Sequence, residues 1–176
     1  MASQQNPFLK RQNEQHEFTH AQIAEFTKCA MDVTYFVDKY CFLQHPVKGK
    51  IPFTLREYQR DVLFTFQHRL AIALLPRQSG KSWLAGAHLL WDAMFKMDRT
   101  IVIASNKNDN AQEMIHRIKF LYENLPFWLK PGLTADGWNK HSVVFDNGSR
   151  ILSQATTEST GRGLSVSLFF LDEFAF

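Results

Sequence analysis

The sequence predicts an α/β fold in which helices flank a mostly parallel β-sheet. From Leu70 onward, short apolar runs typical of buried strands alternate with segments of helical periodicity, as a parallel sheet with crossover helices requires. One further observation modifies this prediction. The dipeptide Asn147-Gly148 lies between two strand-like segments and is the strongest short-range signal for a β-hairpin. We therefore expect a hairpin inserted into the parallel pattern.

The composition is that of a globular protein with one core. Of the 176 residues, 45% are hydrophobic and 21% are charged, which argues against a disordered chain. The formal net charge of +3 permits nucleic-acid binding, although dedicated DNA-binding domains are usually far more basic. No run reaches the ~18 apolar residues of a membrane span, and the polar N-terminus is unlike a signal peptide. We expect a cytoplasmic protein without membrane contact.

The sulfur and imidazole side chains show no metal-binding pattern. Cys29 and Cys41 lack the spacing of a metal site, so we expect free, buried thiols in a reducing compartment. The seven histidines likewise have no metal-ligand spacing, and none is assigned to a metal site.

Three segments are expected along the chain. Residues 1–17 are polar and aperiodic, which predicts a disordered tail. Residues 18–52 form an accessory helical segment, with one helix that begins after a capping box at Thr19 and Gln22 and runs to about Cys41. Residues 53–176 form the α/β domain.

The elements of that domain can be placed in order. A short helix runs through about Phe66, and strands are expected at 70–75, 100–104, 142–146, 150–153 and 167–171. Helices are expected at 81–96 and after a cap at Asn106 or Asn108. The last strand should lead to a loop, a helix and another strand. The sheet instead stops in mid-pattern, so we expect the chain to be the N-terminal part of a longer protein, truncated after this strand.

The segment Pro76-Arg77-Gln78-Ser79-Gly80-Lys81-Ser82 has the features of a phosphate-binding loop. It lies between a predicted strand and a predicted helix, so that backbone N–H groups and the helix dipole would face an anion. Lys81 would reach the β- and γ-phosphates, and the Ser82 hydroxyl would bind Mg²⁺. Leu75 occupies the position of the first glycine in the general motif G-x-x-x-x-G-K-[ST]. An ordinary turn that contains Gly-Lys-Ser is the alternative.

The pair Asp172-Glu173 follows the last predicted strand. A carboxylate at the carboxyl end of a buried strand, near a phosphate-binding loop, lies where Mg²⁺ is held, which is the role expected for Asp172. Glu173 would polarise the attacking water as a general base. A solvated acidic pair at a strand end is the alternative interpretation.

Two arginines and one aromatic–amide pair complete the candidate site. Tyr58 can pack on a base and Gln59 can read an adenine edge, although an exposed helix surface explains them equally well. Arg77 lies within the loop and could stabilise charge on the γ-phosphate. Arg162 lies between two glycines, where it could reach a neighbouring subunit or simply be solvated.

Together these residues resemble the ATPase domain of the large terminase subunit of tailed bacteriophages, especially its T4-like branch. The matching stretches occur in the family's order over about residues 40–176: they are 55–61, 76–82, 145–149, 162–163 and 169–176. The resemblance implies an ASCE or RecA-like P-loop NTPase fold, with 76–82 as Walker A. It also implies that Tyr58 and Gln59 recognise adenine, that Asp172 is Walker B and that Glu173 is the catalytic carboxylate. Arg162 matches an arginine that is proposed, in some members, to act in trans on the ATP of the neighbouring subunit.

The same resemblance implies a function. A protein of this kind hydrolyses ATP with Mg²⁺ to drive double-stranded viral DNA through the portal protein into the procapsid, in the host cytoplasm. The expected partners are the small terminase subunit and further copies of the chain in a homo-oligomeric ring on the portal. The family's coupling motif and nuclease domain are absent from this sequence, so no nuclease activity is expected. A helicase-like DNA translocase and a nucleotide-binding assembly module without turnover are the alternatives.

Overall fold

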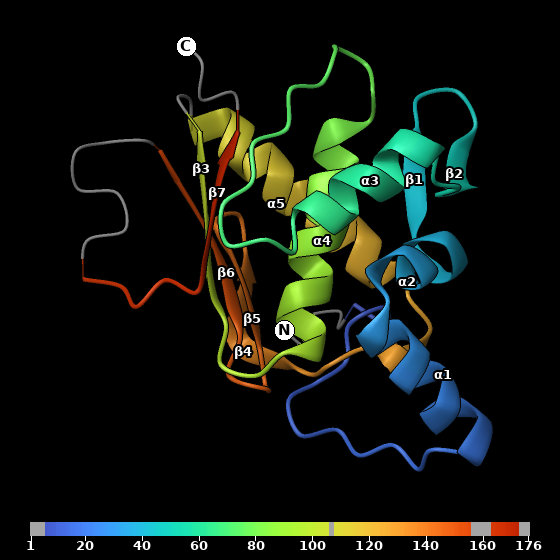
Figure 1. The fold of residues 1–176 in the computed structure, drawn as a ribbon. Helices are drawn as coiled ribbons and strands as arrows, with labels where there is room; N and C mark the ends of the chain where they lie inside the picture. The colour runs from blue at the N-terminus through green and yellow to red at the C-terminus, as the bar shows by residue number, and fades with distance from the viewer. Residues whose placement is uncertain (1–5, 106–107, 156–162, 173–176) are drawn as a thin grey trace.

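The protein has one five-stranded sheet with helices packed on one side of it (Figure 1). A computed structural model describes residues 6–105, 108–155 and 163–172. The strand order is β4-β5-β6-β3-β7, and a separate two-stranded hairpin precedes the sheet in the chain. The strands of the sheet are β3 (Thr100–Ser105), β4 (Leu133–Asn139), β5 (Ser142–Phe145), β6 (Arg150–Ala155) and β7 (Leu168–Asp172).

The sheet is mixed, which corrects the expectation of a mostly parallel one. β3 runs parallel to both of its neighbours, β6 and β7. β5 is antiparallel to both β4 and β6. The hairpin at Asn147-Gly148 is confirmed and accounts for one antiparallel pair. The other pair arises from β4, whose sequence Leu-Thr-Ala-Asp-Gly-Trp-Asn lacks the regular apolar alternation that identifies a strand.

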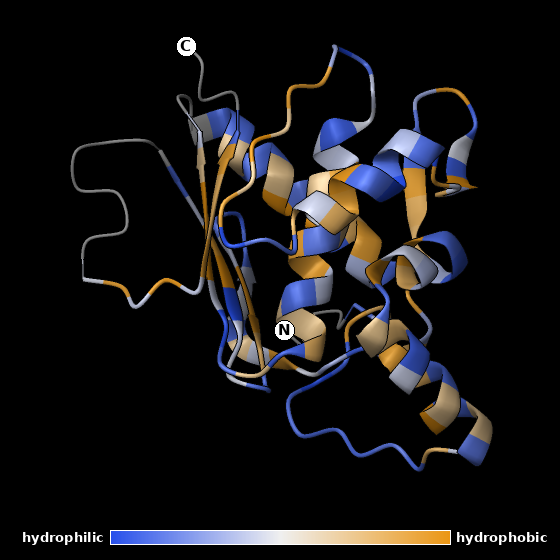
Figure 2. Cartoon of the chain, in the orientation of Figure 1, coloured by the Kyte–Doolittle hydropathy of each residue, from blue (hydrophilic) through white to orange (hydrophobic). Residues whose placement is uncertain are grey.

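Two helices cover the sheet. α4 (Lys81–Phe95) and α5 (Asn108–Glu123) pack against each other and against β3 and β6. Every residue of β3 is buried, and most of α4 is also buried. Much of the ribbon in these elements has the hydrophobic colour in Figure 2. The predicted boundaries of these three elements are confirmed to within two residues where the sequence named them. A helix buried nearly all round is typical of a protein core rather than of a surface element.

The turn of the β5–β6 hairpin is bonded to the C-terminal end of α4. The Asn147 side-chain amide donates to the carbonyl oxygens of Ala93 at 2.9 Å and of Met94 and Lys96 at 3.3 Å each. The Ser149 hydroxyl donates to the same Lys96 carbonyl at 2.9 Å. The last carbonyls of a helix have no partner within it, so these bonds satisfy groups that would otherwise need water.

A buried carboxylate fixes the same helix end to the sheet. Asp92 is 1% exposed and accepts from Lys96 Nζ at 2.5 Å and from Arg99 Nε at 2.7 Å. Arg99 immediately precedes β3, so the Asp92–Arg99 ion pair holds the end of α4 against the start of this central strand. A buried carboxylate is tolerated because both of its oxygens are paired with cations.

The N-terminal segment contains two helices where one was predicted. α1 (His20–Met31) begins after the predicted capping box at Thr19, which is confirmed. Asp32 then ends α1 and caps α2 (Val33–Tyr40), because its Oδ1 accepts from the backbone N–H groups of Thr34 and Tyr35. The apolar stripe continues through both helices and therefore conceals the break at Asp32.

An additional hairpin and a further helix follow. β1 (Phe42–His45) pairs with β2 (Gly49–Pro52), and neither strand is evident from the sequence. α3 (Glu57–Thr65) is the predicted short helix and leads into the segment before the phosphate loop. A 3₁₀ turn (Phe127–Leu129) connects α5 to β4.

The described part of the polar N-terminus lies against the sheet. The Leu133 N–H donates to the Lys10 carbonyl at 2.9 Å, and Lys130 Nζ donates to the Phe8 carbonyl at 2.7 Å. These contacts use the backbone of residues 8–10, so the polar side chains in the sequence give no indication of them.

The strand predicted at 70–75 is wrong. This segment has no regular secondary structure, and Leu70, Ile72 and Leu74 are 88%, 96% and 98% exposed. In Figure 2 it is the hydrophobic stretch of the long loop that precedes α4. A strand needs a hydrogen-bonded neighbour, and in the described part of the chain no strand pairs with these residues. Apolar periodicity reports a tendency to be buried but does not identify the pairing partner.

Both cysteines are free and buried, as predicted. Burial raises the pKa of the Cys29 thiol to about 12, which keeps it protonated and unreactive. Among the described helices, none is long and apolar enough to cross a membrane.

We predict that Asn147→Ala lowers the free energy of unfolding by about 1–2 kcal/mol, because several helix-end carbonyls lose their donor. Urea denaturation measures this loss. Asn124→Ala removes a single amide bond to the Phe120 carbonyl near the end of α5 and should cost less. Equal losses for the two variants would contradict the proposed importance of the hairpin turn.

His88 lies in the buried part of α4. Its ring packs against those of Phe66 and Trp91 and is 5% exposed, and its Nδ1 has no hydrogen-bond partner among the described residues. Burial lowers the pKa of His88 to about 4, although nearby Asp92 acts in the opposite direction. The neutral imidazole is therefore the form that the folded protein accommodates.

This burial predicts a pH dependence of stability. The pKa of His88 is lower in the folded than in the unfolded chain, so its contribution is complete above about pH 6.5 and is lost as the pH falls toward 4. The loss amounts to about 3 kcal/mol at its limit. Urea denaturation between pH 7 and pH 4 should show a steeper decline for the wild type than for His88→Phe. Parallel curves would contradict the assignment.

Candidate functional site

The predicted phosphate loop forms a tight turn that ends at α4. Gly80 is the N-cap of α4 and has φ +76°, a left-handed conformation that glycine adopts at low cost. Gln78 has φ +60°, which is uncommon for a residue with a side chain. The Ser79 hydroxyl donates to the Pro76 carbonyl at 2.9 Å and closes the turn. Residues 76–80 therefore have a defined backbone shape, and the surrounding contacts hold Gln78 in its uncommon conformation.

Lys81 and Ser82 occupy the first two positions of α4, and both are half-buried. The N–H groups of a helix's first turn have no partner within the helix, and the helix dipole places partial positive charge there. Since α4 has 15 residues, its N-terminus offers an anion backbone donors, and the first residue of the helix is the cationic Lys81. Arg77, in the loop itself, is exposed.

The structure brings Tyr58 and Gln59 into contact with this loop. The Tyr58 hydroxyl donates to the Ser79 carbonyl at 2.7 Å, and Gln59 Nε2 donates to the same oxygen at 3.1 Å. Gln59 is buried, and its Oε1 accepts from the Arg56 N–H at 3.0 Å. The sequence singled out both residues for contact with a base. The sequence did not predict that both side chains donate hydrogen bonds to the loop backbone.

A signal for this contact was present in the sequence. Gln59 is the third residue of α3, the position from which a Gln side chain returns to the N-cap N–H in a capping box. Such a side chain is held against the helix start and cannot extend into solvent. Placing the start of α3 at Glu57 would have identified this position.

Asp172 lies at the carboxyl end of β7, opposite Ser105 at the end of β3. These strand ends and the N-terminus of α4 lie toward the same end of the molecule in Figure 1. In α/β sheets, ligands bind at the carboxyl ends of the strands. The half-buried Asp172 therefore lies at the edge where the sequence predicts it. Glu173 and Arg162 lie outside the described residues, and their roles stay predictions.

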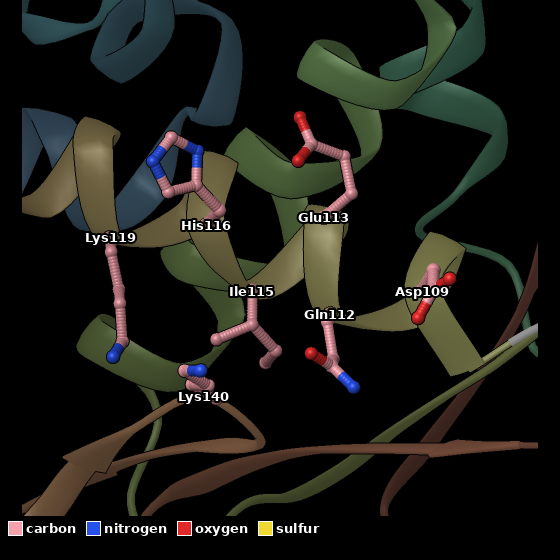
Figure 3. A pocket seen from close by; sticks show the side chains of 7 residues that line it. All are labelled: Asp109, Gln112, Glu113, Ile115, His116, Lys119 and Lys140. Atoms are coloured by element: carbon pink, nitrogen blue, oxygen red, sulfur yellow. The ribbon is translucent and has the colours of Figure 1, made fainter.

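A separate open pocket of about 400 Å³ lies between α5 and the turn that contains Lys140 (Figure 3). Lys119 points from α5 toward the β4–β5 hairpin that contains Lys140, whereas Glu113 and His116 point away from this hairpin. Lys119 Nζ lies 4.6 Å from the centre of the Trp138 ring, and burial lowers the pKa of Lys119. No predicted site residue lines this pocket, and its mixture of acidic and basic groups favours no class of ligand.

The loop geometry predicts a specific cost for a methyl group at Gly80. Gly80→Ala should lower the free energy of unfolding by about 1–2 kcal/mol for the left-handed conformation alone. The added Cβ would also lie 3.1 Å from Gln59 Nε2. Gly163 has a similar φ of +77°, and no atom of the described residues lies within 4 Å of the position that a Cβ would take there. Gly163→Ala is therefore a matched control, because it measures the cost of the left-handed backbone conformation without a close contact. Thermal unfolding should show a larger loss for Gly80→Ala; an equal or smaller loss would contradict the close contact with Gln59.

Two comparisons with known proteins relate this architecture to a family. The structure is similar to the crystal structure of the HK97 bacteriophage large terminase, with a TM-score of 0.62 and 20% sequence identity. The match covers 82% of this chain and 31% of the HK97 protein, so the chain spans about a third of that protein's length. The family model for the N-terminal part of the T4-like terminase large subunit matches residues 72–176, which is more than half of the chain. The chain therefore belongs to the terminase large-subunit family of the T4-like type, and it carries that family's N-terminal region.

Proposed function

We propose that this chain is the ATPase unit of a viral DNA-packaging motor, with a P-loop fold of the ASCE or RecA-like type. The observation that carries the proposal is the turn 76–80 at the N-terminus of α4, in a chain of the terminase large-subunit family. This turn combines backbone donors, a helix dipole and the Lys81 ammonium at one point. Such an arrangement suits the phosphates of ATP better than a neutral ligand.

The residues present fit a nucleotide with a divalent cation. The hydroxyl of Ser82 and the carboxylate of Asp172 are oxygen ligands of the kind that Mg²⁺ prefers, one at the helix start and the other at the strand end. Bound Mg²⁺ would neutralise charge on the β- and γ-phosphate oxygens.

Each remaining side chain has a role in this proposal. Lys81 holds the β- and γ-phosphates, and Arg77 stabilises the charge that develops on the γ-phosphate during transfer to water. Glu173 orients the attacking water and accepts its proton. Arg162 acts on the ATP of the neighbouring subunit. Tyr58 and Gln59 bond to the loop backbone at the Ser79 carbonyl.

The chain spans about a third of the length of the HK97 terminase, so the packaging work is proposed for a whole large terminase subunit. We propose that hydrolysis drives double-stranded viral DNA into the procapsid. The partners are the portal protein, the small terminase subunit and further copies of the chain in a ring, all in the host cytoplasm. Membership of the large-terminase family supports this assignment over a helicase-like translocase.

A nucleotide-binding module without turnover is the second candidate. The observation that favours it is the exposed segment 70–75, which lies directly before the loop and is not part of the sheet. Without a described strand leading into it, the loop would bind phosphate through α4 and yet be less firmly tied to the sheet edge that carries Asp172, and catalysis depends on such positioning.

The test is Mg²⁺-dependent ATP hydrolysis by the 176-residue chain and by a full-length terminase that contains it. We predict that Lys81→Ala and Glu173→Ala each lower the rate of the active protein about 100-fold or more, because each removes a group that acts on transition-state charge or on the attacking water. Chelation of Mg²⁺ should abolish turnover.

Lys119→Ala, in the separate pocket beside α5, is the matched control and should leave the rate unchanged. If the full-length protein hydrolyses ATP equally well with either site substitution, the proposed site is wrong. If only the short chain is inactive while still binding ATP, the second candidate describes this chain.

A further inference from the structure

The carbonyl oxygen of Ser79 accepts two hydrogen bonds from α3. Tyr58 Oη lies 2.7 Å from it and Gln59 Nε2 lies 3.1 Å from it. A carbonyl oxygen has two lone pairs, so these two donors occupy its whole accepting capacity. One peptide group of the loop is therefore fixed by two adjacent side chains of another element.

The orientation of the Gln59 amide follows from its surroundings. Its Oε1 accepts from the Arg56 N–H at 3.0 Å, and its Nε2 faces the Ser79 carbonyl. Exchanging the two ends would set a donor against a donor and an acceptor against an acceptor. Since Gln59 is 5% exposed, water does not compensate for such an exchange. Gln59 is therefore held in the position of a donor to the loop.

Fixing this carbonyl also fixes the neighbouring N–H. The described residues contain no cis peptide bond, and in a trans peptide the C=O and the N–H point in opposite directions. The Ser79 carbonyl faces α3, so the Gly80 N–H faces away from α3. Gly80 is the N-cap of α4, and its N–H belongs to the group of loop donors that an anion at this helix start would meet.

We infer that Tyr58 and Gln59 are positioning residues of the phosphate site: together they clamp the Ser79–Gly80 peptide and aim its N–H at the bound phosphate. This inference rests on the proposed nucleotide binding and deepens it. The clamp acts on the phosphate end of the ligand and therefore affects every triphosphate alike, whatever base it carries. Recognition of adenine by the same residues would affect only adenine nucleotides.

The experiment compares Mg²⁺ complexes of ATP, GTP and base-free tripolyphosphate, with binding measured by titration calorimetry. Tyr58→Phe removes one hydroxyl and leaves the ring, and Gln59→Met removes the second donor at similar volume. Each variant should weaken the binding of all three ligands by a similar factor, about 2–10-fold, and the double variant should weaken it further. Asp61→Asn, on the exposed side of α3, is the control and should bind all three ligands as the wild type does.

A second measurement separates positioning from general loss of structure. The ATP-to-GTP affinity ratio should stay constant in Tyr58→Phe while the amide hydrogen of Gly80 exchanges faster with solvent than in the wild type. A loss confined to ATP would overturn the clamp in favour of adenine recognition, and unchanged binding of tripolyphosphate would overturn it outright. A wild-type chain that binds none of the three ligands would instead refute the proposed nucleotide site.

Discussion

The fastening of α4 at its two ends is the constraint on which the rest of this structure depends. At the C-terminal end, Asn147 bonds the last carbonyls and the buried Asp92 pairs with cations next to β3. At the N-terminal end, α3 holds the Ser79 carbonyl. Because the helix between these points is buried on nearly all sides, it cannot shift without breaking one of the attachments. The loop therefore has a fixed place relative to the sheet edge that carries Asp172.

Much of this frame is predictable because local signals and tertiary contacts agree. The start of α4, the turn at Asn147-Gly148 and the capping box at Thr19 each rest on interactions among near neighbours in sequence. The sequence-based predictions fail where a segment's pairing partner is distant in sequence or where the apolar periodicity is misleading. Segment 70–75 is apolar but pairs with no described strand. β4 is paired but not periodic, and Asp32 interrupts an apolar stripe that continues beyond it.

The candidate site also has some features that the sequence predicts and others that only the structure gives. Residue types and spacing indicate the anion-binding loop and the carboxylate of Asp172, because Gly-Lys-Ser and a strand-end acid have meaning without tertiary context. The capping-box position indicates that the Gln59 amide is held at the start of α3, but the loop atom that this amide meets is known only from the structure. An amide able to donate and to accept suits a base edge and a backbone equally well. Only the geometry around Ser79 distinguishes the two.

The uncovered hydrophobic surface has a consequence for the behaviour of this chain in solution. Leu70, Ile72 and Leu74 are almost fully exposed, and Phe169 and Leu171 on β7 are 44% and 38% exposed. Among the described strands, β7 has a neighbour on one side only. An open strand edge can pair with the edge of another chain, and an exposed apolar run can be buried against one. Concentration therefore governs whether isolated chains stay apart.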